Sequence, residues 1–130
     1  MKKILVFCSD FEQLRALVRF LGQGGGGNEV HGCEDLDAAR FIIKGFKPDV
    51  IVTDWQLGAD TADQVLLQLV AQFDVAQEKL PVATIMCDLT KVTGAEVANA
   101  LRRCMLKIVV QVVEKNEQIG EVILQQVAQA

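Results

Sequence analysis

Short apolar runs alternate with segments of helical periodicity along the chain. The runs predict buried strands at residues 4–7, 50–53, 82–86 and 108–113, and a short, more polar strand at 28–33 that suits a sheet edge. Apolar residues recur every three or four positions between them, which predicts helices at 10–21, 35–44, 62–73, 93–103 and 117–128. This alternation predicts a parallel sheet covered on both faces, a three-layer (βα)5 fold of the α/β class in a single domain, residues 1–130.

Local signals mark several element ends. Asp35 is placed to cap the second helix and Gly45 to stop it. Thr93 and Glu96 form a capping box at the start of the fourth helix. The run Gly24–Gly27 follows a helix rather than a strand and lacks the Lys-Ser/Thr of a phosphate-binding loop, so we interpret it as a flexible connector.

Composition narrows the possible partners. Hydrophobic residues make up 51% of the 130 residues, enough for one substantial core, and charged residues only 23%, which argues against disorder. The net charge of −4 and the scattered basic residues argue against nucleic acid as a partner. No apolar stretch reaches the length of a membrane span, so we expect a cytoplasmic protein without a membrane partner.

The four cysteines and the single histidine carry no recognisable metal-binding pattern. Cys8, Cys33, Cys87 and Cys104 show neither CxxC nor Cys/His ligand spacing, so we interpret them as small buried apolar residues. Cys8 and Cys33 fall on strands expected to be neighbours and could approach one another, although burial of both in the core is the favoured interpretation. For His31 we expect a structural role.

The segment Lys47–Asp54 offers the clearest candidate chemistry. Pro48 precedes a β-branched run, and the run ends on the carboxylate of Asp54. Because the carboxyl ends of parallel strands line the ligand crevice of an open α/β sheet, an acid at that position is a candidate functional group. The alternative is that Asp54 caps a loop or the following helix.

The whole chain resembles a response regulator receiver domain, the CheY-like, flavodoxin-like fold with strand order 2-1-3-4-5. Lys47–Asp54 is similar to the family's Pro-Asp-(apolar)3-x-Asp segment, which ends on the phosphoacceptor aspartate, and Leu80-Pro81-Val82 is similar to the start of its fourth strand. The resemblance implies two-component or phosphorelay signalling, with Asp54 at the phosphoacceptor position. It also implies a protein–protein interaction module rather than an enzyme, with a sensor kinase or another signalling protein as partner.

The resemblance further implies that much of the phosphorylation machinery is replaced. The family's paired acids after the first strand align with Cys8 and Ser9, and its hydroxyl after the fourth strand aligns with Met86. The switch aromatic and the lysine of the fifth strand align with Ile108 and Gln111. A phosphoryl group at the aspartate would therefore lack its usual cationic and hydroxyl contacts.

Magnesium would find few ligands at such a site. By resemblance the metal site consists of Asp10, which lies one place late, together with Asp54 and Gln56. Mg²⁺ prefers oxygen ligands, and the thiol of Cys8 is a poor partner for so hard a cation, so we expect weak Mg²⁺ binding and no other cofactor. We therefore expect a pseudo-receiver that binds partners, and by analogy a homodimer through the last two helices and the fifth strand.

Two other functions remain open at this point. The segment around Cys8 also resembles the first strand and nucleophile of phosphotransferase-system enzyme IIB, which would make Cys8 a phosphoryl carrier, although Asp10 and Glu12 would repel the phosphate. A flavodoxin-type role would use Trp55 for ring stacking, but the phosphate-binding loop that it needs after the first strand is absent.

Overall fold

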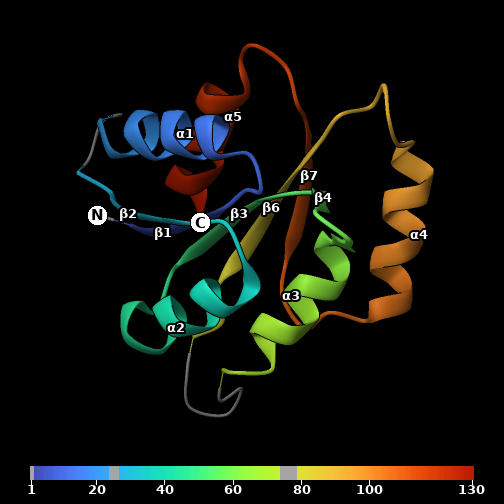
Figure 1. Ribbon diagram of the computed structural model, residues 1–130, viewed down its shortest axis with the longest axis horizontal. Helices are drawn as coiled ribbons and strands as arrows, with labels where there is room; N and C mark the ends of the chain where they lie inside the picture. Colours follow the sequence, from blue (N-terminus) through green and yellow to red (C-terminus); the bar gives the residue numbers. More distant parts are fainter. Residues whose placement is uncertain (1, 24–26, 74–78) are drawn as a thin grey trace.

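A five-stranded parallel sheet in the order β2-β1-β3-β6-β7 forms the centre of the computed structural model, which describes residues 2–23, 27–73 and 79–130 (Figure 1). Its strands are β1 (Lys3–Phe7), β2 (Glu29–Cys33), β3 (Val50–Asp54), β6 (Val82–Cys87) and β7 (Val110–Glu114). The helices are α1 (Phe11–Gln23), α2 (Leu36–Phe46), α3 (Ala62–Val70), α4 (Gly94–Cys104) and α5 (Ile119–Gln129). The predicted three-layer fold and its strand order, 2-1-3-4-5 in terms of the main strands, are confirmed.

The apolar strands are continuous because helices cover both faces of the sheet. Ile4 and Val6 of β1 pack in one hydrophobic cluster with residues of α1 and α5, whereas Leu5 and Phe7 pack in the other with residues of α2, α3 and α4. Each of these four side chains is at most 2% exposed, and full burial of one such side chain contributes about 1.5–3 kcal/mol. The cluster to which a strand residue belongs therefore decides towards which face of the sheet its side chain points.

The predicted helix caps are confirmed. The Asp35 carboxylate accepts a hydrogen bond from the backbone N–H of Ala38 at 2.8 Å, and the Thr93 hydroxyl oxygen accepts one from the N–H of Glu96 at 3.1 Å. Gly45 does not stop α2, which continues to Phe46 and ends at Lys47 in the left-handed conformation (φ 53°). The predicted glycine connector lies mostly outside the described residues.

Two further features differ from the predictions and matter for the site, namely the start of β7 and an additional hairpin. Strand β7 begins two residues later than predicted and extends through Glu114, because Ile108 and Val109 belong to the loop after α4. A short antiparallel hairpin, β4 (Gln56–Leu57) and β5 (Asp60–Thr61), follows β3 and was not predicted.

The more polar strand β2 lies at one edge of the sheet, as predicted. On it, the ring of His31 lies 4.3 Å from the ring of Phe46, centroid to centroid, which fits a packing role. None of the helices in the part of the chain that the structure describes is both long and apolar enough to cross a membrane.

Candidate functional site

The candidate residues come together at the carboxyl ends of four neighbouring parallel strands, β1, β3, β6 and β7. Asp54 is the last residue of β3 and lies beside Met86 of β6, and its side chain is only 8% exposed. The segment after β1 and the residue after β7 meet at the same edge, as expected for parallel strands. They enclose an open cleft of about 930 Å³ whose lining includes Ser9, Asp10, Gln13, Asp54, Trp55 and Lys115.

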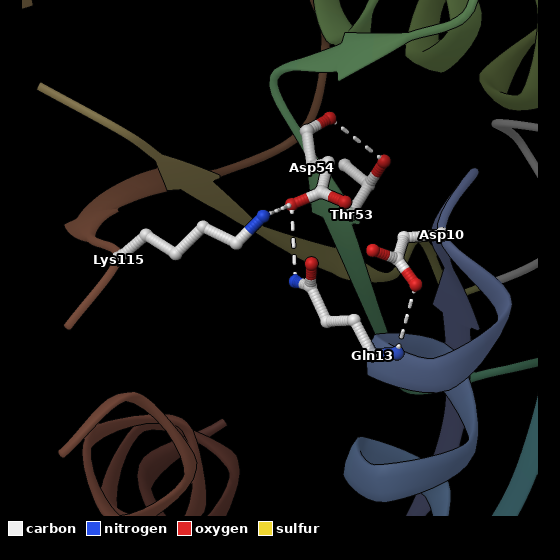
Figure 2. A network of polar contacts seen from close by, with 5 residues as sticks. All are labelled: Asp10, Gln13, Thr53, Asp54 and Lys115. Carbon is white, nitrogen blue, oxygen red and sulfur yellow. Dashed lines mark hydrogen bonds and ion pairs between the residues drawn. The ribbon is translucent and has the colours of Figure 1, made fainter. Parts of the chain in front are cut away.

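Two side chains bind one oxygen of Asp54. The Lys115 Nζ lies 2.9 Å from Asp54 Oδ1, and the Gln13 Nε2 lies 3.3 Å from the same atom (Figure 2). Lys115 comes from the loop after β7, and Gln13 from the first turn of α1. One oxygen of the largely buried carboxylate is therefore bound by an ammonium group and an amide, both supplied by this chain.

The expectation that no lysine reaches Asp54 is wrong. The register of β7 places Val113 beside Met86 and Glu114 beside Cys87, so Lys115 is the first residue beyond the sheet. Gln111, which was aligned with the family's lysine, lies beside Thr84 in the middle of the strand. The error came from setting the fifth strand too early.

The later start of β7 also changes which residue corresponds to the family's switch aromatic. Ile108 lies in the loop before β7 and packs against the cluster formed with α2, α3 and α4. Counting back three residues from Lys115, the spacing that the resemblance gave, leads instead to Val112, which is exposed. Met86 lies beside Asp54 as expected, is buried, and has no hydrogen-bond donor to offer.

The residues assigned to magnesium are engaged elsewhere. Asp10 Oδ1 accepts hydrogen bonds from the backbone N–H groups of Glu12 and Gln13, at 3.0 and 3.2 Å, and so caps α1. The side-chain amide of Gln56 donates to backbone carbonyl groups within its own hairpin. Among the described residues, no three His, Cys, Asp or Glu side chains are grouped in a way that could hold a metal.

The donor set around Asp54 does not suit Mg²⁺. The cation prefers six oxygen ligands and repels ammonium groups, whereas the nearest neighbours of the carboxylate are donors of hydrogen bonds. Ser9 is exposed, and its neighbour Cys8 contributes a buried sulfur.

The cysteines are placed as predicted, as buried apolar residues, with the exception of Cys104, which is partly exposed. Cys8 belongs to the cluster on the α1 and α5 side of the sheet, whereas Cys33 and Cys87 belong to the cluster on the opposite side. The two residues do approach through their backbones, since the N–H of Cys8 donates to the carbonyl of Cys33 at 3.2 Å, but both thiols are free and buried.

The environment of Cys8 opposes its use as a nucleophile. Burial raises the pKa of the Cys8 thiol, and the negative charge of the nearby Asp54 carboxylate raises it further. A thiol with a raised pKa holds almost no thiolate at neutral pH. The phosphoryl-carrier alternative is not favoured by this geometry.

Trp55 is a packing residue at the wall of the cleft. Its side chain is 9% exposed and belongs to the cluster with α2, α3 and α4. Its backbone N–H donates to Met86 at 2.9 Å, and its carbonyl accepts from Ala62 at 2.8 Å, which fixes the turn into the unpredicted β4–β5 hairpin. A ring held in this way offers little surface for stacking on a flavin.

A second polar cluster, which the sequence analysis did not identify, lies farther along the cleft. Asp63, at 8% exposure, accepts a hydrogen bond from the Thr61 hydroxyl, and the Cys104 sulfur lies 3.5 Å from its other oxygen. The contact joins the start of α3 to the end of α4. Because its carboxylate is satisfied on both oxygens, we assign Asp63 a structural role.

No protein-family model and no curated protein matches the sequence. Solved structures match over almost the full chain. The response regulator domain of CheB from Thermotoga maritima has a TM-score of 0.76 and 18% identity, covering 100% of this chain and 96% of that one. A response regulator receiver protein from Pseudomonas putida has a TM-score of 0.75 and 15% identity, covering 99% and 97%.

A CheY-like receiver domain from Methylobacillus flagellatus has a TM-score of 0.71 and 16% identity, covering 98% of both chains. At these identities the likeness shows the fold, and the function has to be argued from the site. The chain has the fold of CheY-like response regulator receiver domains.

Proposed function

We propose that this chain is a receiver-like signalling module that acts by binding partner proteins, with Asp54 at the position of the phosphoacceptor. The observation that carries the proposal is the placement of Asp54 at the carboxyl end of β3, in a cleft, with the Lys115 ammonium group 2.9 Å from its carboxylate. An aspartate and a lysine from these two strand ends are the two parts of a receiver site that this chain keeps.

The parts that it lacks favour a pseudo-receiver. A phosphoryl group adds about −1.5 to −2 charge at neutral pH and needs cations and donors around it. Cys8 and Ser9 stand where the resemblance expects acids that hold Mg²⁺, and Met86 stands where it expects a hydroxyl group. Lys115 is then the one cation bound to Asp54 among the described residues, and we propose that Asp54 is not an efficient phosphoacceptor.

The partner that we propose is a sensor kinase or another signalling protein, and the surface is the one formed by α4, β7 and α5. Three large apolar side chains on this side are exposed, namely Met105, Val109 and Val112. Strand β7 also lies at the free edge of the sheet. The same surface would serve a second copy of this chain, which is the homodimer that we propose alongside.

The pseudo-receiver proposal is tested by incubating the protein with acetyl phosphate and Mg²⁺ and measuring its intact mass. We expect no gain of a phosphoryl group under conditions that label an ordinary receiver domain in the same experiment. A gain that disappears in Asp54→Ala would contradict the proposal and show a working phosphoacceptor. A gain that persists in Asp54→Ala but is lost in Cys8→Ser would support the thiol carrier instead.

A further inference from the structure

Two hydrogen-bond donors converge on one oxygen of Asp54 at the carboxyl end of β3. The Lys115 ammonium group and the Gln13 amide both bind Oδ1, at 2.9 and 3.3 Å (Figure 2). Each of these two groups donates a hydrogen bond, whereas a metal site would offer lone pairs at these places.

Gln13 is placed for this contact by the start of α1. Its backbone N–H is bound by Asp10 Oδ1 at 3.2 Å, so the capped first turn is fixed next to the strand ends. From that turn its side chain extends across the cleft floor to Asp54 (Figure 2). The side chain is half-buried and lines the cleft, so it is positioned by its own helix and by the carboxylate that it binds.

The Gln13 amide donates a hydrogen bond to the Asp54 carboxylate, as a positively charged side chain would, but it adds no charge. A carboxylate that is only 8% exposed needs donors, because an unsatisfied buried charge is strongly destabilising. Lys115 supplies the one positive charge in contact with it, and Gln13 supplies a neutral donor. A divalent cation bound to Oδ1 would have to displace the Gln13 amide, because that oxygen already accepts its hydrogen bond.

We propose that Gln13 is the positioning residue that stands in for a divalent metal at Asp54, so that its amide and the Lys115 ammonium group hold the carboxylate in a site independent of Mg²⁺. This inference rests on the proposed function, because it explains how the site of a receiver-like module stays in a single state. Its test needs neither a phosphodonor nor a partner protein.

The experiment replaces the hydrogen-bond-donating amide of Gln13 by a carboxylate of the same shape, in the variant Gln13→Glu. This variant places a carboxylate against Asp54 and beside Asp10, a group of three acids that a divalent cation would stabilise. The matched control is Gln64→Glu, which adds the same charge to an exposed position in the same cleft. Thermal unfolding of both variants and of the natural protein is measured with MgCl₂ and with NaCl at equal ionic strength.

We expect the Tm of the natural protein and of Gln64→Glu to be the same in the two salts. For Gln13→Glu we expect Mg²⁺ to raise the Tm by roughly 5 °C once its concentration exceeds Kd about tenfold. The emission of Trp55, the sole tryptophan and a wall of the cleft, should change saturably with Mg²⁺ in Gln13→Glu alone. This optical signal separates binding at the site from a general effect of the salt.

Three results would overturn the proposal. The first is a saturable Mg²⁺ response in the natural protein, which would show that the metal site exists beside Gln13. The second is the lack of any Mg²⁺ response in Gln13→Glu, and the third is an equal response in Gln64→Glu. Phosphorylation of Asp54 by acetyl phosphate would contradict the proposed function instead, so the two failures are distinguishable.

Discussion

The ion pair between Asp54 and Lys115 joins the ends of two strands at the cleft. The carboxylate is 8% exposed and the lysine side chain 34%, so the pair is partly shielded from water. Breaking a buried pair by removing one partner leaves a charge that the protein must still accommodate. The pair therefore ties the loop after β7 to the end of β3.

Removing the lysine should cost measurable stability. For Lys115→Met we expect the free energy of unfolding to fall by about 1–2 kcal/mol, a value reduced from that of a fully buried pair because the lysine is partly exposed. Lys91→Met, at an exposed position in the same cleft, should change it by less than about 0.5 kcal/mol. Urea denaturation measures both, and equal losses in the two variants would show that the pair has no special role.

The thiol of Cys33 gives the stability a defined dependence on pH. Burial raises the pKa of Cys33 from 9.0 to about 12, with a further rise from Asp35. The unfolded chain therefore releases this proton near pH 9, whereas the folded chain keeps it, so stability falls as the pH rises from about 9 towards 12.

Cys33→Ala removes this contribution. In that interval we expect the free energy of unfolding of the natural protein to fall more steeply than that of Cys33→Ala, by about 1.4 kcal/mol per pH unit, the value for one proton. Chemical denaturation at a series of pH values provides the two slopes. Parallel slopes would mean that the thiol ionises as readily in the folded protein as in the unfolded chain.

At the scale of the elements, two glycines show how packing decides the effect of one methyl group. A Cβ on Gly45, inside α2, would meet no atom within 4 Å, whereas a Cβ on Gly32, in β2, would lie 2.8 Å from Leu14 and 2.9 Å from Val18 of α1. Gly32 therefore allows α1 to pack closely on the edge strand. Gly45 only adds freedom to the unfolded chain.

The two alanine substitutions should have opposite effects. Gly45→Ala should stabilise the protein by about 0.5–1 kcal/mol, because alanine favours the helix and restricts the unfolded state. Gly32→Ala should destabilise it by about 1–3 kcal/mol through overpacking against the buried Leu14. Thermal unfolding of both variants checks the signs, and stabilisation by Gly32→Ala would mean that α1 is not packed as described.

The elements could be predicted from the sequence wherever periodicity and caps agreed. Asp35 and Thr93 located their helices because their side chains bind the first-turn N–H groups. The start of β7 was missed because the apolar run continues backwards through Ile108 and Val109, which lie in a loop. The β4–β5 hairpin was missed because strands of two residues leave almost no pattern.

The site was predicted in part, and the misses have physical causes. Asp54 could be found because it ends a buried strand and lies in a recognisable segment. Lys115 follows directly after a strand and would have been found with the correct register of β7. Gln13 could not be found, because a glutamine in the first turn of a helix is common and its function depends on a contact 41 residues away.

At the scale of the whole molecule, the sheet order is that of the CheY-like receiver fold, shared with solved structures at 15–18% identity. At the carboxyl ends of the strands, the central carboxylate is bound by an ammonium group and an amide from the chain itself. The proposal of a partner-binding pseudo-receiver depends on this donor set.

The central claim is that Asp54 lines an open cleft but lacks the groups needed for phosphorylation. Its most direct test compares the natural protein with the variant Ser9→Asp/Gln13→Ala/Met86→Thr, which restores one acid and the hydroxyl group expected by resemblance and removes the amide proposed to take the place of the metal. After incubation with acetyl phosphate and Mg²⁺, the intact mass is measured for both, and circular dichroism checks that the variant is folded. We predict no phosphoryl gain in the natural protein and an Asp54-dependent gain in the variant, whereas equal labelling of both would contradict the account.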